Sequence, residues 1–451
     1  MAKGLTRRGA MRAGAGVLAA GAVGAPMVHA QGSAGSLRFA FWDHWVPGAN
    51  GALQQLAQRW GERNRVNMTL DFINTTGNQL QLTIAAQAQS RSGHDGISLL
   101  PWDPGTYANQ LEPVDDVMGR LSQKYGQVNP IAEFLAKRGG AWRGVPATSG
   151  TQTKPALARF DLLQQHAGLD IRAMWPARNE RGPGSDQWTW DTFLRAAEAC
   201  HRAGVPFGLP MGQFTDAVDW VGALFASYGA RLTDERGNPT VRNNQELRQV
   251  LDYAVRLSRF LPNDVWAWDD ASNNRALISG RSALIFNPPS AWAVAKRDAP
   301  QVAENCWTIP MPSGPRGRFL AYLPYVTGIW AFGRNKNAAK AFLEFITERE
   351  NAEFTSTFSQ GYDIPPFLSM ADFRVWETEG PPVGTIFNYP LKPHHQASYS
   401  IAFSPAPPDL AQQMYIQALN TKLIARIAQG NESVDAALGW VEREINNMRR
   451  G

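Results

Sequence analysis

The feature that most constrains the fold is a regular alternation of strand-like and helix-like segments in the first part of the chain. Residues 37–41 are apolar or β-prone, and residues 52–65 then repeat apolar side chains at helical spacing. The same two patterns recur in residues 67–73 and 79–90, and a short buried strand is expected over 96–100. Strands and helices that alternate in this way build a parallel sheet covered by its crossover helices. The sequence therefore predicts an α/β fold with mostly parallel sheets, whose ligands bind beyond the carboxyl ends of the strands.

The rest of the chain continues this pattern over a length that allows two or three domains. The sequence has 451 residues, against roughly 150 for an average domain. Residues 141–146 are strand-like and lead into the small polar segment 148–153, which is typical of a crossing between domains. The further expected elements are helices over 159–167, 192–203, 217–228, 244–259 and 337–347, strand-like stretches over 283–286 and 319–332, and two helices separated by Gly430 and Asn431 in the final 40 residues.

The distribution of charge argues against a nucleic-acid-binding protein. Apolar residues make up 44% of the chain and charged residues 18%, as in an ordinary folded protein. The formal net charge is +5, but Lys3, Arg7, Arg8 and Arg12 supply most of it, and residues 1–30 hold no acid. The remaining chain is nearly neutral, whereas a phosphate backbone needs clustered positive charge. We therefore expect a neutral or mildly polar ligand and no nucleic acid.

Residues 1–30 have the pattern of an export signal peptide. Arg7 and Arg8 precede a weakly apolar run over 13–25, and Val28-His29-Ala30 matches a small-x-small cleavage site. An arginine pair before a run rich in Ala and Gly is typical of twin-arginine export. Sec export stays open, because Ala10-Met11 stands where twin-arginine signals prefer large apolar residues. The run is shorter than the roughly 20 apolar residues that span a bilayer, so we expect the mature protein to be free in the periplasm.

The sequence predicts no metal site, cofactor or catalytic chemistry. In an oxidising compartment Cys200 and Cys306 form either one disulfide or two buried thiols. CxxC and HExxH patterns are absent, and His394-His395 has no third ligand nearby. GxSxG, P-loop and cysteine–histidine signatures are also absent from the mature chain, and the one dinucleotide-like glycine pattern lies inside the export signal.

Aromatic and acidic side chains stand together after two of the expected strands. Trp42, Asp43 and His44 follow the first strand, and Trp102 and Asp103 follow the third. A sugar or polyol presents C–H faces to aromatic rings and hydroxyls to carboxylates, so this pairing is typical of a site for such a solute. The alternative is that Trp42 and Trp102 are core aromatics beneath a loop. A solute site predicts that Trp42→Ala or Trp102→Ala weakens binding by about 1–3 kcal/mol without unfolding the protein.

Several short motifs follow one another in a specific order along nearly the whole mature chain. They include Phe41-Trp42-Asp43, Gly93-His94-Asp95-Gly96, Trp142-Arg143-Gly144-Val145-Pro146, Leu277-Ile278-Ser279-Gly280-Arg281, Ile309-Pro310-Met311-Pro312 and Asn335-Lys336-Asn337-Ala338-Ala339. Each motif is weak alone, but their order and spacing make a chance match improbable. In this pattern the chain resembles the extracellular solute-binding proteins of ABC importers, in the sugar-binding group that includes the maltose-binding protein.

The resemblance implies a periplasmic binding protein fold of two α/β lobes, joined by three crossings, that close over a solute by a hinge motion. The first lobe would comprise residues 37–147 and 320–365, and the second residues 148–319 and 366–451. The implied partners are a small-molecule solute and the membrane permease and ATPase of an ABC importer. We expect a monomer that performs no catalysis.

The resemblance also implies solute contacts outside the first strands. Gln152 falls in the crossing where relatives place a polar contact, and Asp216 and Trp220 fall where they place another in the second lobe. Trp292 lies two residues beyond the slot, occupied here by Ser290, in which relatives carry a stacking aromatic ring. Three more candidates lie near expected strand ends or a crossing: Asn287, Tyr322 and Tyr325.

Two other functions stay open. One is a periplasmic sensor or scavenger that passes its ligand to something other than an importer. The other is a glycoside hydrolase, because Asp43 and Asp103 could serve as the two carboxylates that glycosidic cleavage requires.

Overall fold

The computed structural model describes residues 35–75, 78–177, 181–380, 382, 385, 395, 397–399 and 405–450. All of them belong to one compact unit, Ser33–Gly451. The predicted export signal over residues 1–30 and the predicted loop residue His394 lie outside the described residues. Within the described ranges, no helix combines the length and the apolar character needed to cross a membrane.

A five-stranded sheet forms the centre of the first lobe. Its strand order is β2-β1-β3-β12-β6, and the strands are β1 (Ser36–Trp42), β2 (Asn67–Ile73), β3 (Gly96–Leu99), β6 (Val145–Pro146) and β12 (Val326–Ile329). β1 lies parallel to β2 and β3, and β12 runs antiparallel to β3 and β6. The alternating start of the chain is therefore confirmed as a parallel arrangement of strands.

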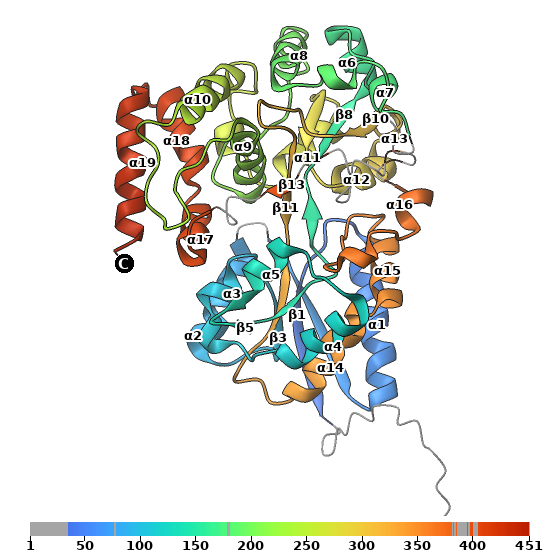
Figure 1. The fold of residues 1–451 in the computed structure, drawn as a ribbon. Helices are drawn as coiled ribbons and strands as arrows, with labels where there is room; N and C mark the ends of the chain where they lie inside the picture. The colour runs from blue at the N-terminus through green and yellow to red at the C-terminus, as the bar shows by residue number, and fades with distance from the viewer. Residues whose placement is uncertain are drawn as a thin grey trace, which may run out of the picture. The chain divides into compact units, whose positions relative to one another are not determined.

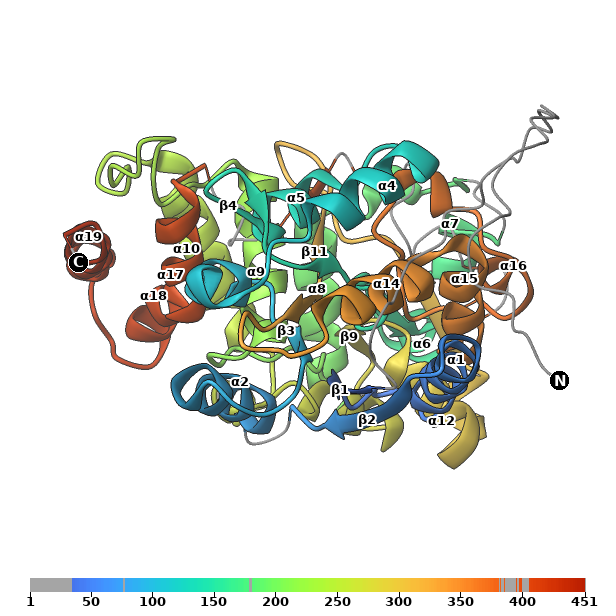
Figure 2. The same cartoon turned by 90° about the horizontal axis from the view of Figure 1, so that it is seen from below.

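Helices from both halves of the sequence pack around this sheet (Figure 1). The first-lobe helices are α1 (Gly48–Asn64), α2 (Gln79–Ser90), α3 (Asp103–Thr106), α4 (Asp115–Tyr125), α5 (Pro130–Ala136), α14 (Lys336–Thr347) and α15 (Arg349–Phe358), with a small hairpin of β4 (Lys137–Arg138) and β5 (Ala141–Trp142). Phe342 of α14 meets the ring of Phe39 in β1 at 5.3 Å and the ring of Trp60 in α1 at 5.4 Å. Figure 2 shows α14 beside α1 and α15, so distant parts of the chain share one core.

The second lobe holds two three-stranded sheets. One has the order β10-β8-β9, with β8 (Ala156–Arg159), β9 (Leu284–Phe286) and β10 (Cys306–Ile309); the other has the order β13-β11-β7, with β7 (Gln152–Thr153), β11 (Phe319–Leu323) and β13 (Ala397–Tyr399). β8 is antiparallel to both of its neighbours. The sequence predicts a mostly parallel sheet here, whereas β8 lies between β9 and β10 and runs opposite to both.

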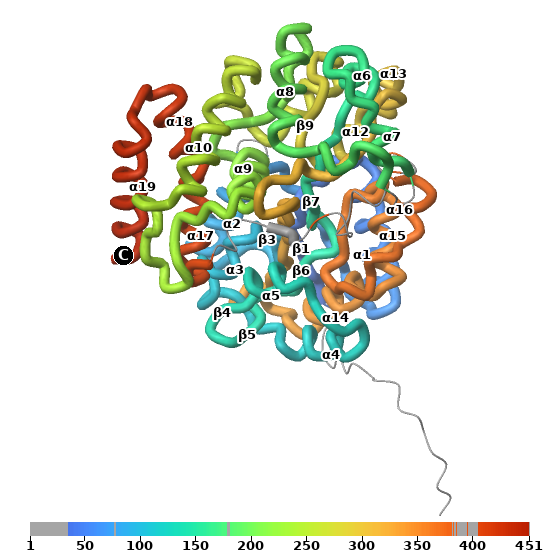
Figure 3. Tube along the Cα trace, turned by 45° about the horizontal axis from the view of Figure 1, so that its top comes forward, coloured from blue at the N-terminus to red at the C-terminus, as the bar shows by residue number. Residues whose placement is uncertain are grey.

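The helices of the second lobe come from the middle and the end of the chain. They are α6 (Phe160–Ala167), α7 (Ile171–Met174), α8 (Trp190–Arg202), α9 (Thr215–Tyr228), α10 (Gln245–Ser258), α11 (Ser272–Ile278), α12 (Ser290–Asp298), α13 (Pro300–Ala303), α17 (Pro408–Ile416), α18 (Leu419–Ala428) and α19 (Val434–Met448), and α16 (Val375–Thr378) packs against α15. Figure 3 shows the red C-terminal helices beside α10, which α18 contacts. The two helices predicted on either side of Gly430 and Asn431 are α18 and α19, and α17 begins before the final 40 residues. Ala418 adopts a left-handed conformation (φ 52°) between α17 and α18.

The stretch 319–332, which reads as one strand, forms two strands in different sheets. β11 pairs with β7 and β13, and β12 pairs with β3 and β6. Pro324 stands between the two strands and has no N–H to donate to a sheet, which interrupts the pairing. Residues 320–323 thus pair with β7 and β13 rather than within the five-stranded sheet that contains β12.

Two described segments pass between the lobes, residues 147–151 and residues 324–325, and we call them the crossing segments. The loop after α15, residues 359–364, lies against them. The backbone hydrogen bonds that join the three are Ala147 N–H to Tyr325 O at 2.8 Å and Ile364 N–H to Thr151 O at 2.9 Å.

Cys200 and Cys306 are separate buried thiols. Burial raises the pKa of each thiol to about 12. Of the two states left open by the sequence, the structure therefore has the unpaired one.

Candidate functional site

A small cavity lies between the lobes, and we call it the cleft cavity. Its volume is about 30 Å³. The first-lobe side supplies Trp45, Thr75, Gln81, Leu100 and Tyr362, the crossing region supplies Gln152 and Tyr325, and the second-lobe side supplies Thr215, Asp216, Asp270, Asn274, Asn287, Pro288 and Ser290. Trp45, Thr75 and Leu100 follow β1, β2 and β3, so the cavity lies beyond the carboxyl ends of the parallel strands, as the sequence predicts. A cavity of this volume holds about one water molecule, so the lobes must separate to admit a solute.

Aromatic side chains form the first-lobe wall of the cleft cavity. Trp45, Tyr325 and Tyr362 line it. Trp42 lies directly behind them, with its ring centroid 5.4 Å from Tyr325 and 5.8 Å from Tyr362. Trp42 is 2% exposed, and its buried indole nitrogen has no hydrogen-bond partner in the part of the chain that the structure describes. Trp42 therefore supports the aromatic wall from within the core.

Carboxylates gather around one buried lysine on the second-lobe side. Lys154 Nζ lies 2.6 Å from Asp216 Oδ1 and 2.8 Å from Asp219 Oδ2. Asp216 and Asp270 are adjacent, because the Asp216 N–H donates to Asp270 Oδ1 at 3.0 Å. Asn273 Nδ2 donates to the other Asp216 oxygen at 2.9 Å, and the Tyr415 hydroxyl donates to Asp219 Oδ1 at 3.0 Å. We call Lys154, Asp216, Asp219 and Asp270 the acid cluster.

Burial and mutual repulsion shape the protonation of the acid cluster. Burial, reinforced by the carboxylate of Asp216, raises the pKa of Asp270 to about 7. Burial also raises the pKa of Asp219, although the Lys154 ammonium opposes it. Burial by itself would lower the pKa of Lys154, but the three surrounding carboxylates outweigh it and raise the pKa. Lys154 is therefore a charged counterion for a cluster with an excess of acid.

Four of the sequence-predicted site residues line the cleft cavity: Gln152, Asp216, Asn287 and Tyr325. Gln152 and Asn287 are nearly buried, and the Ser290 hydroxyl donates to Asn287 Oδ1 at 3.0 Å. The structure thus brings together Tyr325 of a crossing segment, Gln152 of β7 directly after the other crossing segment, and Asp216 and Asn287 of the second lobe.

His44 and Asp43 lie beside the cavity and hold local structure. His44 Nδ1 accepts from the Val46 N–H at 2.8 Å, so its Nε2 carries the proton and donates to Asp363 Oδ1 at 3.1 Å. The same Asp363 oxygen accepts from the Gly150 N–H at 2.7 Å. This carboxylate therefore ties the end of β1 and the loop after α15 to a crossing segment. Asp43 Oδ1 accepts from Asn50 Nδ2 at 2.7 Å in α1.

Trp102 and Asp103 lie at the start of α3. The half-buried Trp102 ring meets Tyr415 of α17 at 5.1 Å, which joins the first lobe to the helix that contacts the acid cluster. Asp103 is buried, and its Oδ2 accepts from the Leu100 N–H at 2.8 Å. Neither side chain lines the cleft cavity in this closed arrangement.

The remaining predicted residues lie in packed surroundings outside the cleft cavity. Trp220 is fully buried and donates its indole N–H to Pro210 O at 2.7 Å. Trp292 belongs to the cluster around β9 and α12, with Lys296 Nζ 4.6 Å from its ring centroid. Tyr322 of β11 is buried, and its hydroxyl makes no hydrogen bond to any residue that the structure describes.

Sequence reasoning missed several residues that line the cavity, chiefly Trp45, Asp270 and Tyr362. Trp45 belongs to the same run as Trp42 and His44, so the strand-end argument was sufficient to find it. Asp270 adjoins Asp269 and two tryptophans in the sequence, but its place beside Asp216 depends on long-range packing. Tyr362 lies in the loop after α15 and has no local signal.

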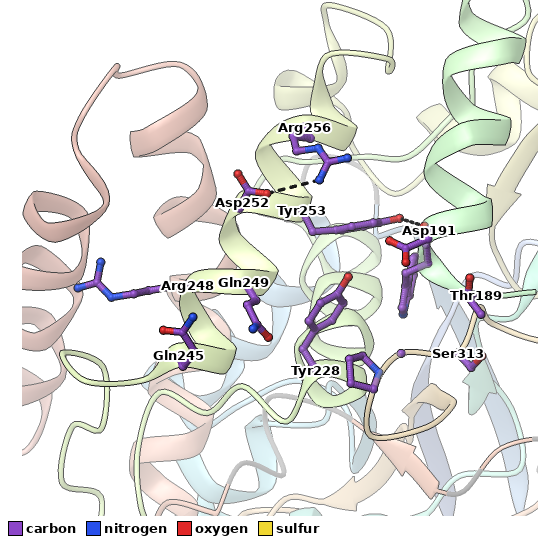
Figure 4. A pocket seen from close by; sticks show the side chains of 13 residues that line it. Thr189, Asp191, Tyr228, Gln245, Arg248, Gln249, Asp252, Tyr253, Arg256 and Ser313 are labelled. Atoms are coloured by element: carbon purple, nitrogen blue, oxygen red, sulfur yellow. Dashed lines mark hydrogen bonds and ion pairs between the residues drawn. The ribbon is translucent and has the colours of Figure 1, made fainter.

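A larger cavity of about 630 Å³ lies within the second lobe (Figure 4). Its lining includes Tyr228 of α9 and Tyr253 of α10, and Asp252 and Arg256 form an ion pair at 3.6 Å on its rim. The Tyr253 hydroxyl donates to Trp190 O at 2.7 Å. Every residue that lines it belongs to the second lobe, so movement of the lobes would not enclose a ligand there.

Comparison with known proteins gives one family and one fold. A family model described as "Bacterial extracellular solute-binding protein" matches residues 47–353. The fold is similar to that of maltose-bound MalE3 from T. maritima, at a TM-score of 0.70 and 16% identity, covering 92% of this chain and 100% of that chain.

Two further solved structures show the same fold similarity. A solute-binding protein of an ABC transporter from Thermotoga lettingae TMO, bound with α-D-tagatose, has a TM-score of 0.71 at 14% identity, covering 92% of this chain and 99% of that one. A sugar transporter protein from Arthrobacter chlorophenolicus A6 with bound laminaribiose has a TM-score of 0.67 at 14% identity, covering 91% and 99%. No curated protein matches the sequence.

Proposed function

The chain belongs to the bacterial extracellular solute-binding proteins, and on that premise we propose that it captures a sugar or polyol-like solute in the cleft cavity and delivers it to an ABC importer. The observation that carries the proposal is the composition of the cavity. Aromatic rings of the first lobe and hydrogen-bonding groups of the second lobe meet only where the lobes touch. A solute that contacts both walls favours the closed state over the open one.

The solute class follows from the two walls. Aromatic rings suit the C–H faces of a sugar, and carboxylates and amides suit its hydroxyls. The similar structures hold maltose, tagatose and laminaribiose, which is consistent with this class. The proposed contacts are Trp45, Gln152, Asp216, Asp270, Asn287 and Tyr325.

The proposed partners are the permease and ATPase of the importer, reached by a monomer in the periplasm after twin-arginine export. We also propose that the protein binds its solute without catalysing a reaction on it. Asp43 is held by Asn50 and Asp103 by the Leu100 N–H, and neither carboxylate lines the cleft cavity, which disfavours a hydrolytic pair.

A thermal-shift screen against sugars and polyols tests the proposed capture, because a ligand that binds only the folded state raises the melting temperature. The best ligand is then titrated by calorimetry into the wild type and Trp45→Ala. We expect Trp45→Ala to lose about 1–3 kcal/mol of binding free energy, which corresponds to roughly fivefold to 150-fold in affinity.

Trp440→Ala is the matched control. Trp440 is also half-buried, but it lies on α19 against Arg426, outside the residues that line the cleft cavity. Equal losses in both variants, or a panel in which no sugar or polyol shifts the melting temperature, would contradict the proposal.

A further inference from the structure

The charged side chains that line the cleft cavity are carboxylates. Among the described residues that line it there is no lysine, arginine or histidine. Gln81 Oε1 and Asn274 Oδ1 are buried atoms of this lining that have no hydrogen-bond partner among the described residues. Two carboxylates, Asp216 and Asp270, lie in the same lining. The charged groups of the described lining are therefore acceptors alone, and a cationic donor on the solute is complementary to them.

The charges of the acid cluster are also unbalanced. Lys154 is the one basic side chain in it, and its ammonium is already shared between Asp216 and Asp219. Asp270 is hydrogen-bonded by the Asp216 N–H and by the Thr215 side chain, but it has no ion pair among the described residues. Two carboxyl groups side by side at the cavity leave room for one more positive charge.

We propose that the solute carries a protonated amine, as an amino sugar or amino polyol does, and that its ammonium group binds beside Asp216 and Asp270. This inference rests on the proposed function and narrows its solute class. An ammonium offers three donors and no acceptor, which matches the unpartnered oxygens of the lining. It also forms charge-assisted hydrogen bonds with carboxylates, and the aromatic wall attracts cations.

The same arrangement excludes acidic sugars. A carboxylate or phosphate on the solute would face the carboxylates of the acid cluster without any cation in the lining to compensate. Repulsion of this kind is a usual source of specificity.

The test is a matched ligand series at constant pH and low salt. Glucosamine, glucose and glucuronate, with the disaccharides chitosan dimer, cellobiose and cellobiuronate, are titrated by calorimetry into the wild-type protein. We expect an amino member to bind at least tenfold more tightly than its neutral counterpart, and the acidic member to bind most weakly. The preference for the amine should diminish as salt is added, because screening weakens charge interactions.

Asp270→Asn and Asp269→Asn form a matched pair of variants for the same series. Asp270→Asn keeps the shape of the side chain but removes the charge, so it should lower the amine preference at least fivefold. Asp269 instead accepts hydrogen bonds from Arg275 and Ser272, so Asp269→Asn should leave the preference for the amine unchanged. The melting temperature of each unliganded variant checks that it is folded.

The outcomes separate the two proposals. Neutral sugars that bind as tightly as their amino counterparts, or an unchanged preference in Asp270→Asn, overturn the amine inference and leave sugar capture standing. A series in which no sugar of any charge binds overturns both.

Discussion

At the scale of single residues, the carboxyl group of Asp103 makes the stability of the fold depend on pH. Burial raises its pKa to about 7, although the Leu100 N–H acts in the opposite direction. In an unfolded chain an aspartate has a pKa near 3.9, so the folded protein holds this proton more tightly. The contribution of Asp103 therefore favours folding below about pH 4 and is lost as the pH rises through about 7.

We expect Asp103→Asn to raise the free energy of unfolding relative to the wild type at pH 8 by a few kcal/mol, and to give no gain at pH 4. The amide keeps an oxygen that can accept from the Leu100 N–H and removes the cost of a buried charge. Urea denaturation at the two pH values measures both differences. An equal effect at pH 4 and pH 8 would show that Asp103 has no shifted pKa.

Trp42 supports the fold rather than only the site. Its ring packs against His44, Tyr325 and Tyr362 in the core. Trp42→Ala should therefore lower the free energy of unfolding by about 3–5 kcal/mol, as truncation of a buried aromatic residue does. The sequence alone predicts weaker binding without unfolding. Denaturation of Trp42→Ala and Trp45→Ala side by side decides between these two expectations. Only Trp42→Ala should lower the free energy of unfolding by about 3–5 kcal/mol.

At the scale of elements, the crossing segments impose a strict requirement on Gly150. Its φ is +96°, and an added Cβ would lie 3.0 Å from Tyr325 Cγ and 3.1 Å from Trp42 Cε3. Gly150→Ala should lower the free energy of unfolding by about 2 kcal/mol or more, from backbone strain and crowding together. Gly204→Ala is the control, since its φ is +78° but nothing lies within 4 Å of the added Cβ. If both variants lose a similar amount of unfolding free energy, the packing around Gly150 does not contribute to the effect.

The elements that depend on local periodicity were the most predictable from the sequence. The alternation of β1, α1, β2, α2 and β3 follows from local periodicity, and it also places Trp45, Thr75 and Leu100 at the cavity. Local periodicity cannot show which sheet a strand joins, so 319–332 reads as one element. It also cannot show which indole faces inward where β1 ends, and Trp42 rather than Trp45 was predicted to touch solute. The acid cluster joins residues 154 and 270 through packing that has no local signature.

At the scale of the whole Ser33–Gly451 unit, α17 joins the lobes on one side of the cleft. Arg138 Nε lies 3.4 Å from Asp409 Oδ1, and Trp102 meets Tyr415. A Cβ at Gly105 would lie 2.3 Å from Gln412 Oε1. This side of the cleft is therefore tightly closed.

Gly105→Phe should act as a wedge between α3 and α17. We expect the wild type to become more compact in small-angle X-ray scattering when its solute is added, and the variant to stay expanded with an affinity at least tenfold lower. Gly119→Phe on α4 is the control, because nothing lies within 4 Å of its added Cβ. A variant that compacts like the wild type would place the hinge contacts elsewhere.

The adjacent carboxylates of Asp216 and Asp270 also affect the balance between the open and closed forms of the empty protein. Closing without a solute donor would strip water from two neighbouring carboxylates that have only Lys154 as a cationic partner, which is unfavourable for buried charge. The empty protein thus has an electrostatic reason to remain open. A permease that recognises the closed form would then rarely bind a protein that carries no solute.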